Sequence, residues 1–168
     1  MSLDLEKALK DWAMENLESI GVYRDKVPNF DELQQKVINS LTATYSEEAL
    51  RLFFNPANMH PLPTPDGFAR VIGPCGDTME VYLKVENGEV AEASFQTDGC
   101  TPSIMSGAMV AQLARGKSIN KAQRIDQETV LQALGGLPDE SAHCALLAAN
   151  TLKKAINDAL ITAVNDCT

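Results

Sequence analysis

Several features that mark other classes of protein are scarce in this sequence. Its 168 residues hold 14 lysines and arginines against 23 aspartates and glutamates, so the formal net charge is −9 at pH 7. The negative electrostatic potential of such a chain repels phosphate backbones and anionic lipid headgroups, which argues against nucleic acid or a membrane as a partner. The sequence also lacks a run of 18 apolar residues and a basic flank followed by an apolar segment at its start. We therefore expect neither a membrane span nor a secretory signal, and we predict a cytoplasmic protein.

Cysteine is scarce as well, and no Cys-x2-Cys pair occurs. The cysteines are Cys75, Cys100, Cys144 and Cys167. In a reducing compartment such thiols stay reduced, so metal binding or redox chemistry is a better interpretation than a disulfide framework. Cys167, the penultimate residue, has no partner at a useful spacing and is not assigned a role.

The remaining composition is that of an ordinary globular domain with room for a short appendage. Hydrophobic residues make up 45% and charged residues 22% of the chain. Residues 1–44 carry apolar side chains at helical spacing, which predicts two amphipathic helices, with Asn29 and Glu32 as a capping pair at the second start. A shorter helix is predicted after Ser46, and the proline-rich segment 55–67 is predicted to be an extended connector.

Three β-like runs follow the connector, at residues 68–73, 78–86 and 89–97. In the second run apolar and polar residues alternate, which is typical of a strand with one buried face. Asn87-Gly88 marks a hairpin turn. A strict two-residue loop would place apolar residues opposite polar ones, so we expect a three-residue loop or a bulge that brings Val81 opposite Phe95 or Ala93.

The rest of the chain is predicted to be helical. Helices are expected from Thr101, with Pro102 at the first position, to Gly116, over 118–124 and 126–134, and from near Asp139 to the end. The predicted fold class is α+β: a small three-stranded antiparallel sheet packed by helices, with an extra N-terminal helical segment.

Chemistry-bearing residues gather at one end of this predicted sheet. Cys75 precedes the second strand and Cys100 follows the third, so the hairpin pairing brings the two thiols together. Cys100 comes just before a predicted helix, and Cys144 lies near the start of the last helix. Because helix N-termini favour anions, we expect lowered pKa values for both thiols.

Two further side chains suit the same site. His143 directly precedes Cys144, and Asp77 lies two residues after Cys75. Three sulfurs with one nitrogen or oxygen suit tetrahedral zinc or an iron-sulfur cluster, and do not suit calcium or magnesium. His60, in the connector, is interpreted as a solvated loop residue.

The motifs themselves are more specific than their spacing. NPANMHPL, GPCGD, FQTDGCTPSIMSGAMVAQLARGKS and LPDESAHCALLAANTLKKAI occur in this order. Together they resemble the IscU-type (NifU N-terminal) iron-sulfur cluster assembly scaffold. The resemblance covers residues 45–168, the expected scaffold domain, and leaves residues 1–44 as an N-terminal helical extension.

This resemblance implies a scaffold, without turnover chemistry of its own, on which iron and sulfur are built into a labile [2Fe-2S] cluster. A cysteine desulfurase would supply sulfur as persulfide, and apo iron-sulfur proteins would accept the cluster. Cys75, Cys100 and Cys144 match the family cysteines that bind the cluster and take up persulfide. Asp77 matches the aspartate that keeps the cluster labile, and His143 matches a histidine that is an alternative fourth ligand.

The sequence also departs from the family pattern. Members served by a specialised Hsp70 chaperone carry Leu-Pro-Pro-Val-Lys before the His-Cys pair, where this chain has LPDES at residues 137–141. That difference argues against dependence on the chaperone. The alternative function is a zinc-binding persulfide acceptor, although such relatives typically carry an insertion between the second and third cysteines and lack the histidine. A third interpretation is an interaction protein whose thiols are idle.

Overall fold

The computed structural model describes residues 3–24 and 28–165. Within them the elements follow one another as α1 (Leu3–Ser19), α2 (Phe30–Thr44), α3 (Glu47–Phe54), β1 (Gly67–Ile72), β2 (Thr78–Glu86), β3 (Glu89–Thr97), α4 (Thr101–Ala114), α5 (Ile119–Ala122), α6 (Gln127–Leu134), the 3-10 helix η1 (Asp139–Ser141) and α7 (Ala142–Asn165). The α+β fold class predicted from the sequence is confirmed. None of the helices in the described part of the chain is long and apolar enough to cross a membrane.

The sheet is an antiparallel meander in the order β1-β2-β3. Asn87 and Gly88, both at positive φ, form a two-residue turn between β2 and β3. The register shifts between Lys84 and Val85, where Ala91 is the extra residue of β3. This bulge restores Val81 to its position opposite Phe95, so the expected bulge is confirmed while the turn itself keeps two residues.

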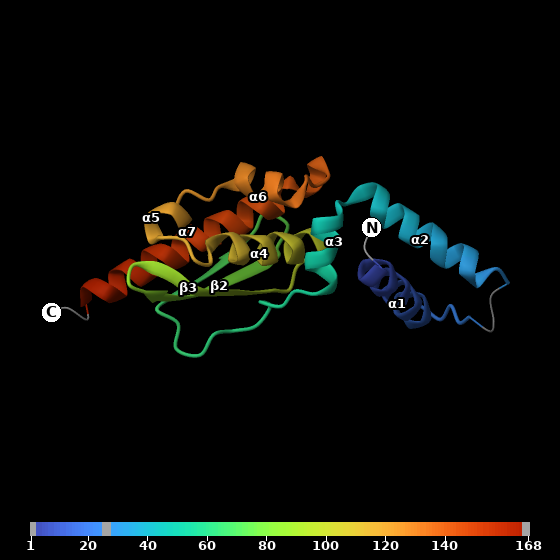
Figure 1. Cartoon of the computed structure of the whole chain (residues 1–168), viewed down its shortest axis with the longest axis horizontal. Helices are drawn as coiled ribbons and strands as arrows, with labels where there is room; N and C mark the ends of the chain where they lie inside the picture. The colour runs from blue at the N-terminus through green and yellow to red at the C-terminus, as the bar shows by residue number, and fades with distance from the viewer. Residues whose placement is uncertain (1–2, 25–27, 166–168) are drawn as a thin grey trace.

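One face of the sheet carries the core. Met79, Val81, Leu83 and Phe95 are fully buried there, beneath α4 and α7 (Figure 1). Helix α4 approaches β3 closely at Gly107, because any Cβ at that position would overlap the ring of Phe95. The opposite face is more open, and Phe68 and Tyr82 stack on it with ring centroids 5.0 Å apart.

Local signals account for most helix boundaries. The Ser46 side chain accepts a hydrogen bond from Ala49 N and caps α3, and Asp126 caps α6 through Thr129 N. Helix α4 starts at Thr101 with Cys100 as its N-cap, one residue earlier than expected. The expected Asn29 cap is wrong: Asn29 takes a left-handed conformation, with φ 64°, and its side chain makes no capping hydrogen bond.

The two N-terminal helices form a hairpin at the end of the molecule where α3 lies, away from the sheet (Figure 1). Trp12 of α1 packs edge-on against Phe53 and Phe54 of α3, with centroid distances of 6.0 and 5.8 Å. Leu9 of α1 is fully buried. The hairpin is therefore packed on α3 rather than on the sheet.

Candidate metal centre

Three side chains from distant parts of the chain converge at one end of the sheet. Ligand atoms of Asp77, Cys100 and Cys144 all lie within 4.8 Å of one another. Asp77 comes from the turn between β1 and β2, Cys100 from the junction of β3 and α4, and Cys144 from the first turn of α7. Two sulfurs and a carboxylate at this separation are close enough to bind the same transition-metal ion.

The turn that carries Asp77 is closed by backbone hydrogen bonds. Gly73 N donates to Asp77 O at 2.8 Å, and Gly76 N donates to Gly73 O at 3.0 Å. Gly76 has a φ of +89°, a conformation that residues with a side chain rarely adopt. This tight turn leaves Cys75 exposed at its tip.

Asp77 is held by groups at the start of α4. Ser103 Oγ donates to Asp77 Oδ2 at 2.8 Å, and Cys100 N donates to the same oxygen at 3.3 Å. The hydrogen bond from Ser103 is the main reason that the pKa of Asp77 lies below its ordinary value, with smaller contributions from Cys100 and Cys75. The carboxylate is therefore ionised and points toward the thiols at neutral pH.

The two inner thiols differ in exposure. Cys100 is exposed and Cys144 is fully buried, with their sulfurs 3.9 Å apart. The lowered pKa expected for Cys144 is wrong: burial raises the pKa of this thiol, and the neighbouring Cys100 adds to the rise. The removal of the thiolate from water outweighs the lowering effect of the nearby Ser103 hydroxyl on the pKa of Cys144.

This difference predicts an order of thiol modification. With iodoacetamide at neutral pH, we expect Cys144 in the metal-free chain to react about tenfold or more slowly than Cys100, because the thiolate is the nucleophile and Cys144 is both buried and protonated. Its rate should keep rising above the pH at which an ordinary thiol has titrated. Peptide mass spectrometry over time measures both sites, with the urea-unfolded chain as control. Faster reaction at Cys144 than at Cys100 would contradict the burial described here.

The other residues predicted for the site lie at its margin or away from it. His143 Nε2 lies 3.6 Å from Cys144 Sγ, close enough to join a metal site after a small movement. Cys75 lies near enough to affect Asp77 and Cys144, although its sulfur is not within the 4.8 Å group. His60 is exposed beside Pro61 and lines a different pocket with Arg51 and Glu92. Cys167 lies outside the described residues.

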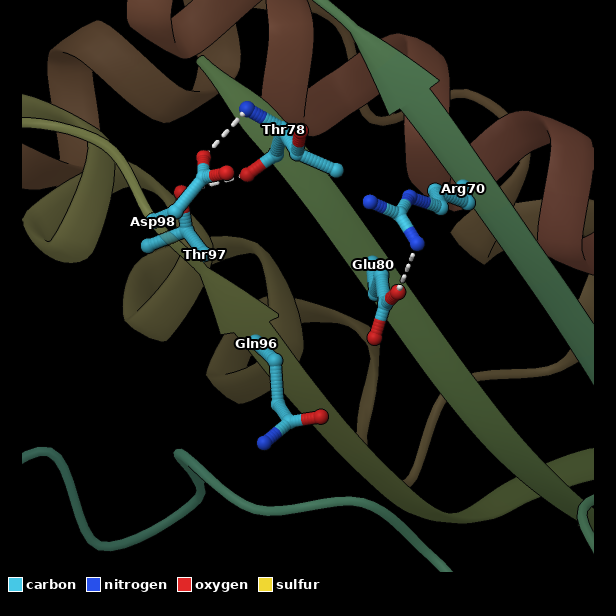
Figure 2. A pocket seen from close by; sticks show the side chains of 6 residues that line it. All are labelled: Arg70, Thr78, Glu80, Gln96, Thr97 and Asp98. Atoms are coloured by element: carbon cyan, nitrogen blue, oxygen red, sulfur yellow. Dashed lines mark hydrogen bonds and ion pairs between the residues drawn. The ribbon is translucent and has the colours of Figure 1, made fainter.

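A shallow pocket of about 230 Å³ lies on the sheet next to this end (Figure 2). Its wall contains Thr78 and Asp98, the residues that follow Asp77 and precede Gly99-Cys100. Asp98 Oδ1 accepts a hydrogen bond from Thr78 N at 2.6 Å, which ties the start of β2 to the end of β3. Arg70 and Glu80 form an ion pair at 3.5 Å on the same wall. This bracing fixes the two backbone segments from which Asp77 and Cys100 project.

Sequence reasoning missed two residues at the centre. Ser103 is fully buried among the candidate ligands, and Gly99 leaves the space that Asp77 and Ser103 occupy. The available signal was helical spacing: Ser103 is three residues after Cys100 and so lies on the same face of α4.

The fold and the centre define a small α+β protein with thiols and a carboxylate brought together at one end of a three-stranded sheet. The chain belongs to the NifU-like N terminal domain family, whose profile matches residues 44–163. It is similar to the iron-sulfur cluster assembly scaffold protein IscU 1 of Archaeoglobus fulgidus, with 40% identity over 68% of this chain and 75% of the relative. The IscU scaffold protein of Aquifex aeolicus is 35% identical over 70% of this chain and 76% of its own.

Two further similarities agree with this assignment. A Drosophila melanogaster protein named iron-sulfur cluster assembly enzyme IscU is 34% identical over 74% of this chain and 84% of its own. The crystal structure of a NifU-like N-terminal protein from Brucella abortus matches with a TM-score of 0.55 and 21% identity, over 69% of this chain and 94% of that one. At that identity the structural match shows the fold alone.

Proposed function

We propose that this chain is a scaffold for iron-sulfur cluster assembly: it receives iron and sulfur, builds a labile [2Fe-2S] cluster on Cys75, Cys100 and Cys144, and passes it to apoproteins. The observation that carries the proposal is the convergence of Asp77, Cys100 and Cys144 within 4.8 Å. Membership of the family and the names of the relatives support it. The cluster is the cargo of the protein, and the chain acts as a carrier rather than as an enzyme with turnover of its own.

Sulfur delivery follows from thiol chemistry. A scaffold thiolate attacks the outer sulfur of a persulfide on a cysteine desulfurase, which releases the desulfurase thiolate and leaves a persulfide on the scaffold. Cys75, Cys100 and Cys144 are the candidate acceptors. This exchange needs no net electrons, but reduction of the bound persulfide to sulfide consumes two, which an electron-carrier protein or a thiol must supply.

The fourth ligand is proposed to come from Asp77 or His143. Asp77 is already oriented toward the thiols by two hydrogen bonds. A hard carboxylate is a poorer partner for an iron-sulfur cluster than a thiolate, so a cluster that uses Asp77 should be released readily. His143 is the alternative because its Nε2 lies 3.6 Å from Cys144 Sγ.

The second candidate function is a zinc-binding persulfide acceptor. The donor set itself is compatible with this alternative, because two thiols and a carboxylate suit tetrahedral Zn²⁺ as well as iron. The presence of His143 and the lack of an evident insertion between Cys100 and Cys144 favour the scaffold.

Anaerobic reconstitution tests the proposal. The full chain is incubated with ferrous iron, cysteine and a cysteine desulfurase, and we expect the visible absorption of a [2Fe-2S] cluster that moves to an apo-ferredoxin. A Cys100→Ser variant is the matched control and should give little chromophore. Tight Zn²⁺ binding with a persulfide and no transferable chromophore would establish the zinc alternative instead. A chain that takes up neither metal nor persulfide would contradict both.

Two further features of the proposal concern partners and organisation. The segment before His143 lacks the lysine and second proline of chaperone-dependent members, so we propose that transfer needs no specialised Hsp70. We also propose that residues 1–44 form an accessory unit, because the family match begins at residue 44 and the hairpin contacts α3 through Trp12.

A further inference from the structure

A buried serine lies at the centre of the candidate ligand set. Ser103 is in the first turn of α4 and is fully buried. Its Oγ lies 2.8 Å from Asp77 Oδ2, 3.4 Å from Cys144 Sγ and 3.6 Å from Cys100 Sγ. One hydroxyl therefore contacts every member of the group that converges at this end of the sheet.

The single proton of this hydroxyl has a preferred acceptor. A serine donates one hydrogen bond, and an ionised carboxylate is a stronger acceptor than a neutral thiol. The oxygen of Asp77 is also the nearest of the three neighbours. Ser103 therefore donates to Asp77, and its oxygen remains available to accept from a thiol.

The surrounding backbone is shaped to allow this contact. A Cβ at Gly99 would lie 2.7 Å from Ser103 Cβ and would overlap Asp77 Oδ2. Cys100 N adds a second donor to the same carboxylate oxygen. The serine, the glycine and one backbone N-H thus define a single orientation for the Asp77 side chain.

We propose that Ser103 is a positioning residue of this centre: its hydroxyl holds the Asp77 carboxylate over Cys100 and Cys144, ready to bind a metal ion. This positioning role depends on one part of the proposed function, namely that the centre binds a metal ion. A carboxylate has about four lone-pair positions, so the bond from Ser103 leaves others for an ion. Groups that orient ligands in this way commonly contribute about 10-fold to 100-fold to metal affinity.

The test uses Zn²⁺ and Co²⁺ as probes on the full chain. For Ser103→Ala we expect Zn²⁺ affinity to fall about tenfold in competition with a chromophoric chelator. The Co²⁺ absorption bands should change in position or intensity, because the carboxylate is no longer oriented. Ser103→Thr keeps the hydroxyl and should restore both readouts to nearly the parent values.

A matched control lies one turn further along the same helix. Ser106 is also fully buried, and its Oγ has no hydrogen-bond partner among the described residues. Ser106→Ala therefore removes a buried hydroxyl from α4 without touching Asp77, and we expect unchanged Zn²⁺ affinity. Thermal unfolding of the metal-free variants shows whether each chain is folded.

A double substitution separates positioning from a general structural effect. If Ser103 acts through Asp77, Ser103→Ala should change Zn²⁺ affinity less than about twofold in an Asp77→Ala chain. A full tenfold loss in that background would overturn the proposal, and so would parent-like affinity in Ser103→Ala alone. A tenfold loss of Zn²⁺ affinity in Ser103→Ala would support the positioning role even if the parent chain forms no transferable cluster. In that case the proposed scaffold function would be wrong and the positioning role would stand.

Discussion

Replacing Asp77 by alanine is expected to slow transfer of the cluster from this chain by about tenfold. The carboxylate is the hardest member of the proposed ligand set, so it should exchange with an incoming acceptor thiolate more easily than Cys100 or Cys144. Without Asp77, His143 is the remaining candidate for the fourth ligand. Its Nε2 lies 3.6 Å from Cys144 Sγ. An imidazole is a softer ligand than a carboxylate and should hold the cluster for longer.

The measurement is the half-time of transfer to apo-ferredoxin after anaerobic reconstitution, followed by visible absorption or circular dichroism. Asp77→Ala and His143→Ala are compared with the parent, together with the double variant. The double variant shows whether His143 replaces Asp77 as a ligand. We expect it to transfer the cluster faster than Asp77→Ala does, because neither side chain is then present. Equal or faster release from Asp77→Ala would eliminate the proposed role of the aspartate in lability.

Deletion of residues 1–44 is expected to leave a folded protein that melts roughly 5–10 °C below the full chain. The family match begins at residue 44, and the sheet, α4 and α7 keep their core without the hairpin. The loss of stability comes from α3, whose Phe53 and Phe54 would lose their contacts with Trp12.

Two assays distinguish packing from partner docking in this truncated chain. Cluster formation from inorganic sulfide should be retained, since the three cysteines, Asp77 and His143 are all present. If the hairpin only packs on α3, formation with a cysteine desulfurase is retained as well; selective loss of the desulfurase reaction would show docking. Trp12→Ala in the full chain is the control and should lower the melting temperature by less. An unchanged melting temperature after deletion would contradict the packing described here.

Local chemistry made the strands and most helix boundaries predictable. The alternation in β2, the Asn87-Gly88 turn and the caps Ser46 and Asp126 each act within a few residues of sequence. The register was predicted only in part: the pattern left a three-residue loop or a bulge open, with Val81 opposite Phe95 or Ala93, and the structure has the bulge and Phe95. Asn29 was mispredicted, since the same side chain that caps helices also tolerates the left-handed conformation that it adopts here.

The centre was predictable only in part, because its properties depend on contacts between distant segments. The motifs identified the candidate ligands, and the hairpin placed Cys75 and Cys100 at one end of the sheet. The burial of Cys144 could not be deduced from its position near a helix start, since it depends on what packs over α7. The contact between Ser103 and Asp77 was equally hidden, because Asp77 lies 26 residues earlier in the chain.

The separation of the ligands along the chain has a thermodynamic consequence. Asp77 and Cys100 are 23 residues apart, and Cys100 and Cys144 are 44 residues apart. A cargo held by all three closes two loops, as a pair of covalent cross-links would, and so restricts the unfolded chain. Loading should therefore raise the free energy of unfolding, and unloading should return that energy. Under the proposed function, an acceptor must bind the cluster more tightly than the folded scaffold does, and transfer leaves a scaffold that is less stable than the loaded one.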